Sequence, residues 1–101
     1  MSRTLTKPTD SQSPVAADLR ALGLLIRNRR AHSMLRIDDA AALVGVSKET
    51  LSRLENGRAV STDKLMAVAQ GLGLTLIVTD KWLAGKVVRS IEEDAGKQGA
   101  D

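Results

Sequence analysis

A thirteen-residue segment, 45–57, combines two helix stops with a row of polar side chains between them. Gly45 is typical of a helix C-terminus, which favours a residue that tolerates positive φ, and Ser47 is a good N-cap for a following helix. Helical spacing in that second helix hides two leucines, at 51 and 54, and turns polar side chains to solvent: Lys48, Glu49, Ser52 and Arg53. A short helix with an exposed polar first turn suits the major groove of DNA. The same residues would also suit an ordinary helical hairpin.

The composition excludes several classes of protein. At 101 residues the chain is long enough for one small domain. It has no cysteine and one histidine, His32, which excludes a disulfide framework and a metal site built from thiolates or several histidines. No apolar run approaches the roughly 20 residues that span a bilayer, and residues 1–14 lack the apolar core of a signal peptide. We therefore expect a cytoplasmic, nucleoid-associated protein with no membrane partner.

The same residues argue against an enzyme. His32 is the only side chain with a base strength suited to neutral pH, and the chain has neither a thiol nor a glycine-rich phosphate loop. We expect no catalytic residue, no metal and no cofactor. The charge instead favours a polyanionic partner. Residues 19–80 contain nine Lys or Arg and six Asp or Glu, so they carry the whole net charge of +3.

Periodicity divides the chain into a short arm, a helical domain and a C-terminal extension. Residues 1–14 are rich in Ser, Thr and Pro and are predicted to be a disordered arm. The helical domain spans residues 15–73, and its helices are predicted over 15–32, 37–44, 47–56 and 62–72. The apolar face of the fourth helix is predicted to consist of Leu65, Met66, Val68, Ala69 and Leu72.

Branched and apolar residues after the fourth helix predict a strand within residues 74–80. Its members are Leu74, Thr75, Leu76, Ile77, Val78 and Thr79. A lone strand leaves its backbone groups unpaired, so we expect the same strand of a second copy to pair with it and form a homodimer. The alternative is an extended chain that packs against its own helices. A further helix is predicted over residues 81–94, followed by a frayed tail to residue 101. Trp82 in this C-terminal segment is predicted to pack within the dimer or to anchor a partner protein.

The spaced positions of residues 19–74 resemble the helix-turn-helix of the Xre/Cro/lambda-repressor family. They are Leu22-Gly23, Ile26-Arg27, Arg30, Leu35, Ala41, Gly45-Val46-Ser47, Leu51-Ser52-Arg53-Leu54-Glu55-Asn56-Gly57, Leu65, Ala69 and Leu72-Gly73-Leu74. The resemblance implies a compact all-α domain of four to five helices, with the predicted strand added for dimerisation. The strand after the fourth helix looks like that of the HipB antitoxins, which are dimeric repressors that also bind the HipA kinase toxin.

The resemblance also implies roles for individual residues. The third helix would be the recognition helix, and its exposed positions would be Ser47, Lys48, Glu49, Thr50, Ser52 and Arg53. Lys48 and Arg53 suit the O6 and N7 acceptors of guanine, and Glu49 could accept from N4 of cytosine. The alternative for Glu49 is an ion pair with one of these two cations. Contacts to the DNA backbone are implied for Arg36, Asn56 and Arg58.

Two further residues are implied to act inside the protein. Arg30 and Glu55 stand where the family commonly has a partly buried ion pair between the first helix and the end of the third. The start of the second helix departs from the family pattern of Thr-Gln, because Arg36 and Ile37 stand there. Ile37 makes no polar contact, so this helix is expected to lack its usual cap, and Arg36 would compensate with a phosphate contact.

The sequence therefore predicts a homodimeric repressor that binds a palindromic operator in double-stranded DNA. The narrower hypothesis is the antitoxin of a HipA-like toxin–antitoxin module, with the kinase toxin as its protein partner. The alternatives are a stand-alone regulator without a toxin and a protein-interaction module with the same helical fold. The salt dependence of DNA binding distinguishes the last of these, because each neutralised phosphate steepens it.

Overall fold

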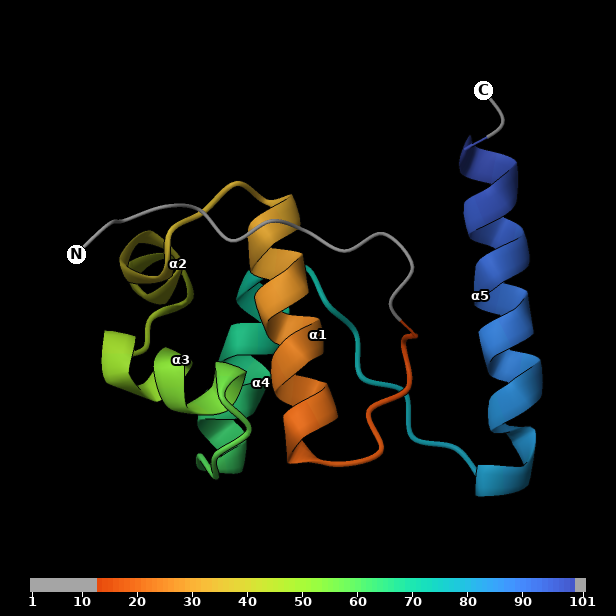
Figure 1. Cartoon of the computed structure of the whole chain (residues 1–101), viewed down its shortest axis with the longest axis horizontal. Coiled ribbons are helices and arrows are strands. Elements are labelled where there is room, and N and C mark those ends of the chain that lie inside the picture. Colours follow the sequence, from red (N-terminus) through yellow and green to blue (C-terminus); the bar gives the residue numbers. More distant parts are fainter. Residues whose placement is uncertain (1–12, 100–101) are drawn as a thin grey trace.

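The computed structural model describes residues 13–99, and within them all regular structure is helical (Figure 1). The five α-helices and one 3-10 turn, η1, are α1 (Leu19–His32), α2 (Ile37–Val44), α3 (Lys48–Glu55), α4 (Thr62–Gly71), η1 (Lys81–Leu83) and α5 (Ala84–Gly99). The predicted all-α class with four to five helices is confirmed. The predicted arm over residues 1–14 lies outside the described residues except for its last two positions.

The helix ends follow from local backbone chemistry. The carboxylate of Asp18 accepts a 2.8 Å hydrogen bond from the backbone N–H of Ala21, so α1 begins at Leu19. The prediction of a start at residue 15 is wrong, because it overlooked this cap. Gly45, at φ 81°, ends α2 in the left-handed region, and Ser47 caps α3. As expected from the sequence, the start of α2 has no side-chain cap.

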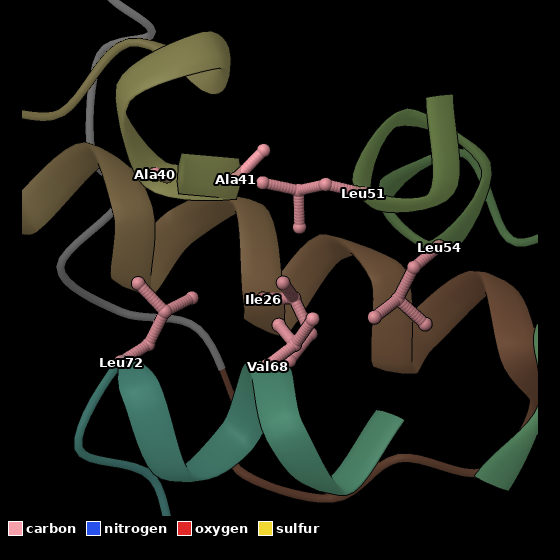
Figure 2. Packing of buried hydrophobic residues seen from close by; sticks show 7 residues of the cluster. All are labelled: Ile26, Ala40, Ala41, Leu51, Leu54, Val68 and Leu72. Atoms are coloured by element: carbon pink, nitrogen blue, oxygen red, sulfur yellow. The ribbon is translucent and has the colours of Figure 1, made fainter. Parts of the chain in front are cut away.

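Helices α1 to α4 enclose one small apolar core (Figure 2). Each of the four helices or its end contributes to it: Ile26, Ala40, Ala41, Leu51, Leu54, Val68 and Leu72. Of the apolar face predicted for α4, Met66 is 46% exposed and lies off the core. The core is built mainly from contacts of α1 and α2 with α3 and of α2 with α4. It therefore fixes α3 from one side and leaves its other side on the surface.

Two glycines allow helices to approach closely. A Cβ on Gly23 of α1 would collide with the carbonyl oxygen of Leu54 and lie 2.8 Å from that of Glu55. A Cβ on Gly71 at the end of α4 would collide with the side chain of Val44. The first glycine lets the backbone of α3 rest directly on α1, so it sets the depth at which α3 is seated.

Residues 73–80 form no strand. The strand predicted at Leu74, Thr75, Leu76, Ile77, Val78 and Thr79 is not borne out, because within the described chain these residues belong to no hydrogen-bonded ladder. Leu74 packs against the core, and its backbone N–H donates to the carbonyl oxygen of Ala69 at 2.8 Å. The later residues run as extended chain to α5, with Ile77 60% and Val78 97% exposed.

Helix α5 stands beside the four-helix body in Figure 1 and packs mainly against η1. It continues to Gly99, so the end predicted at residue 94 is too early. The buried core contains no described residue after Leu72. No helix within residues 13–99 is long and apolar enough to cross a membrane.

Candidate nucleic-acid interface

The outer side of α3 and the turn after it form a continuous polar surface. Its members are Ser47, Lys48, Glu49, Arg53, Asn56 and Arg58, which are exposed, and Thr50 and Ser52, which are half-buried. We call this set the α3 surface. Leu51 and Leu54 on the opposite side of the helix are almost fully buried, so α3 has no freedom to rotate about its axis.

Ser47 and Thr50 organise the first turn of α3. The hydroxyl oxygen of Ser47 accepts from the backbone N–H of Thr50 at 3.1 Å. The Ser47 hydroxyl also donates to Oγ1 of Thr50 at 2.9 Å. Both side chains therefore stabilise the start of α3. Each hydroxyl can still make a further hydrogen bond to solvent or to a ligand.

Lys48 and Glu49 project from this turn without an internal partner. Neither side chain makes a hydrogen bond or an ion pair with another residue in the part of the chain that the structure describes. The alternative of an ion pair between Glu49 and Lys48 or Arg53 is therefore absent from the structure. A cation and a carboxylate stand side by side at a helix start, one able to donate to a base edge and the other able to accept from one.

The C-terminal end of α3 forms a shallow hollow lined by Ser52, Arg53, Asn56 and Arg58. Nη2 of Arg53 donates to the carbonyl oxygen of Ala59 at 3.1 Å, which secures the turn after the helix. Nδ2 of Asn56 donates to the carbonyl oxygen of Ser52 at 2.8 Å. Arg53 is thus partly used inside the protein, whereas Arg58 at the rim makes no internal ion pair in the described chain. Two guanidinium groups around a polar hollow suit a phosphate group.

Arg36 lies at the start of α2, the helix that precedes the turn into α3. Its Nε atom is 3.3 Å from Oδ2 of Asp39 in an exposed ion pair. A phosphate contact by Arg36 would have to compete with this carboxylate. Because exposed ion pairs contribute little, about 0–1 kcal/mol, that competition would cost little.

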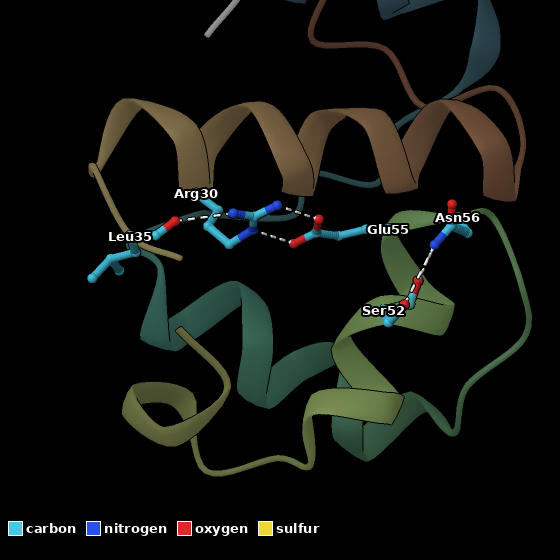
Figure 3. A network of polar contacts seen from close by, with 5 residues as sticks. All are labelled: Arg30, Leu35, Ser52, Glu55 and Asn56. Carbon is cyan, nitrogen blue, oxygen red and sulfur yellow. Dashed lines mark hydrogen bonds and ion pairs between the residues drawn. The ribbon is translucent and has the colours of Figure 1, made fainter. Parts of the chain in front are cut away.

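A buried ion pair fixes α3 to α1 (Figure 3). Nε of Arg30 donates to Oε2 of Glu55 at 2.7 Å, and Nη2 donates to Oε1 at 2.8 Å. Nη1 of Arg30 also donates to the carbonyl oxygen of Leu35 at 2.9 Å. The side chains of Arg30 and Glu55 are only 6% and 4% exposed. The structure thus places this guanidinium inside the protein, where it connects α1, the α1–α2 turn and the end of α3.

Two structural residues have roles that the sequence reasoning missed. Nε of Arg29 donates to the carbonyl oxygen of Leu72 at 2.7 Å and so closes the C-terminus of α4. No local sequence signal links these two residues, which lie 43 positions apart. Gly23 is different, because a glycine inside an apolar helical pattern is itself a sign of close packing.

The C-terminal residues singled out from the sequence lie away from the α3 surface. Trp82 in η1 is 76% exposed and does not pack into the core. Of the residues predicted for dimerisation, Leu74 is half-buried and the other five are exposed. Among residues 13–99 no cluster of His, Asp or Glu side chains is arranged to hold a metal ion.

Known proteins share the sequence pattern and the fold of this helical domain. The helix-turn-helix domain family matches residues 21–82, which include all of α2, α3 and α4. Among solved structures, the chain is similar to the clp gene regulator ClgR from C. glutamicum, with 35% sequence identity and a TM-score of 0.52. The similarity covers 66% of this chain and 85% of that one. A comparison with curated proteins found no match. The chain belongs to the helix-turn-helix domain family.

Proposed function

We propose that this protein is a sequence-specific DNA-binding transcription regulator that reads its site with α3. The observation that carries the proposal is the α3 surface, on which Lys48, Glu49 and Arg58 have no internal side-chain partner in the described chain. The helix that presents them is seated on a buried core and a buried ion pair. A rigid support lowers the entropy lost on binding. The family match and the similarity to ClgR, a gene regulator, point in the same direction.

The proposed roles follow from position on α3. Lys48 and Glu49 in the first turn read base edges, Lys48 at guanine and Glu49 at cytosine. Arg58 and Asn56 at the other end of the helix contact phosphates and position the duplex without reading it. Arg53 contributes to both base reading and phosphate contact, since Nη2 donates to the carbonyl oxygen of Ala59 and the side chain is exposed.

A helix of eight residues reads only a few base pairs, which is too little for a specific site. We therefore propose that two copies bind one operator with approximate two-fold symmetry. Two-fold symmetry in the protein calls for an inverted repeat in the DNA. The centres of its half-sites would be one helical turn, about 34 Å, apart. A dimer seated over a promoter would repress transcription by occlusion.

We do not add the antitoxin role to this proposal. It rested on the strand predicted after the fourth helix, and residues 73–80 form no strand. A HipA-like kinase toxin therefore has no structural observation behind it in this chain. We propose the regulator without a toxin partner.

Two matched substitutions test the proposed roles on a duplex recovered by binding selection. Lys48→Ala should relax base preference at one position of each half-site, with a loss of about 1–3 kcal/mol on the preferred base. Arg58→Ala should weaken binding to all sequences alike and make the salt dependence shallower by about one unit of logarithmic slope. Arg27→Ala, an exposed arginine of α1 outside the α3 surface, is the control and should change neither.

Equal effects of Lys48→Ala and Arg58→Ala on every sequence would contradict the assigned roles. A salt-independent affinity for the duplex would contradict the phosphate contacts. No affinity for any duplex at low salt would contradict DNA binding itself and favour the protein-interaction module. The free energy of unfolding of each variant, measured by urea denaturation, separates loss of contacts from loss of the fold.

A further inference from the structure

Helix α5 is an amphipathic helix whose apolar side is only partly covered in the described chain. Its apolar members are Ala84, Val87, Val88, Ile91 and Ala95, none of which is buried. It contacts mainly the short η1 turn. Isolated helices of this length are marginal in water, and most helices gain their stability by packing an apolar face. The family match ends at residue 82, so α5 lies outside the region to which that family assigns a role.

The charges at the start of α5 and in its second half differ in sign. Residues 81–90 contain Lys81, Lys86 and Arg89 and no acidic residue. Residues 91–99 contain Glu92, Glu93 and Asp94 and a single basic residue. The partial charges at helix ends favour acidic side chains at the N-terminus and basic ones at the C-terminus. This effect is confined to the first and last turns, where the sequence places Lys86, which is unfavourable, and Lys97, which is favourable, whereas Glu92, Glu93 and Asp94 lie in the middle of the helix. The helix dipole therefore does not account for the separation of the charges.

A second copy of α5 running antiparallel would satisfy both features. The basic half of each helix would then lie beside the acidic half of the other, whereas a parallel pair would place like charges together. The apolar spacing agrees with this. Ala84, Val88, Ile91 and Ala95 are separated by four, three and four positions, a spacing that reads the same from either end. A two-fold pair centred between positions 89 and 90 places Ala84 beside Ala95 of the other copy, and Val88 beside Ile91.

We propose that α5 is the dimerisation element of this protein and pairs antiparallel with α5 of a second copy. The inference deepens the proposed function by naming the surface through which two reading helices are joined. Trp82 in η1, directly before the helix, is 76% exposed and adds apolar surface there. This matters because a pair of helices about 24 Å long contributes only part of the roughly 800 Å² per partner of a standard interface.

Cysteine cross-linking tests the direction of the pair, since the chain has no cysteine of its own. In the antiparallel pair the two copies of residue 88 are offset by about 4–5 Å along the axis, and those of residue 84 by about 16 Å. A disulfide needs Cα atoms about 4.4–6.8 Å apart. Under mild oxidation of the full chain without DNA, Val88→Cys should form a covalent dimer and Ala84→Cys should not.

Charge reversal tests the complementarity independently. The double variant Lys86→Glu/Arg89→Glu makes both halves acidic and should raise the dimer dissociation constant about tenfold or more in sedimentation equilibrium. It also places acidic residues near the N-terminus of α5, which favours the isolated helix, so a weaker dimer would not reflect helix unfolding. Adding Glu92→Lys/Glu93→Lys to the same chain should restore the wild-type dissociation constant.

Equal cross-linking at positions 84 and 88 would overturn the antiparallel arrangement. A monomeric chain at about 100 μM, well above the micromolar range expected for a small interface, would overturn α5 as the dimerisation element. These measurements use no DNA, so they separate failure of this inference from failure of the proposed function. A monomer that still selects a DNA sequence would refute only the former.

Discussion

The buried pair between Arg30 and Glu55 gives the sharpest prediction about the fold. We expect Glu55→Met and Arg30→Met each to destabilise the protein strongly, because each leaves a buried charged group without its partner. In Arg30→Met the carbonyl oxygen of Leu35 also loses the 2.9 Å hydrogen bond that the guanidinium donates. The double variant Arg30→Met/Glu55→Met should be less destabilised than the two single losses added together.

The expected loss in the free energy of unfolding follows from the burial of this ion pair. Both side chains are 6% exposed or less, and two short hydrogen bonds, 2.7 and 2.8 Å, join them. Removing one partner of such a pair costs about 3–5 kcal/mol, whereas an apolar replacement of both is often near neutral. A domain of this size has about 5–15 kcal/mol of stability in total. Each single variant should therefore lose a large share of it.

Urea denaturation followed by circular dichroism measures these free energies. DNA affinity should be measured at low temperature and expressed per folded molecule, because an unfolded variant would otherwise imitate the loss of a DNA contact. Per folded molecule, Arg30→Met should bind DNA nearly as the wild type does, because the buried Leu51 and Leu54 still seat α3 on the core. Single losses below about 1 kcal/mol, or a double variant as unstable as the sum of the singles, would show that the two side chains do not form a buried, coupled pair.

Three further predictions concern backbone contacts and pH. Gly23→Ala should cost about 1–3 kcal/mol in urea denaturation, because its Cβ would meet the backbone of α3, whereas Gly85→Ala has open space around it and should leave stability unchanged or raise it by up to about 1 kcal/mol. Arg29→Met removes the 2.7 Å hydrogen bond to the carbonyl of Leu72 and should cost about 1–2 kcal/mol. A hydrogen bond from the side chain of Ser61 holds the pKa of Asp63 below 3.8, so this carboxylate stabilises the fold above that pH and the contribution is lost as the pH falls through the lowered pKa. Asp63→Asn should remove that part of the acid dependence, and an unchanged acid-unfolding curve would contradict it.

The sequence predicted the middle of the chain well because its signals there are local. Gly45 and Ser47 mark the end of α2 and the start of α3, and both helix ends lie where those residues place them. The ion pair of Arg30 with Glu55 was accessible only through the family resemblance, since nothing local relates residues 25 positions apart. The same limit explains why the bond from Arg29 to Leu72 was missed.

The C-terminal region was predicted less well because its signals do not distinguish structures. A run of branched residues favours a strand, yet strand formation depends on a ladder partner that composition does not reveal. The run at 74–79 is extended without forming one. For α5 the apolar spacing predicted a helix correctly, but its exposed face and its charge order became informative only when the structure showed that the four-helix body does not cover it.

The central claim is that α3 reads a specific DNA sequence, and a binding selection tests it most directly. The purified full chain is mixed with a library of random duplexes at moderate salt, and the recovered DNA is sequenced through successive rounds. We expect enrichment of a short inverted repeat whose half-sites are centred about 10–11 base pairs apart. With Lys48→Ala we expect loss of preference at one position of each half-site. Recovery of no sequence above the starting library, by a protein that remains folded, would contradict this claim.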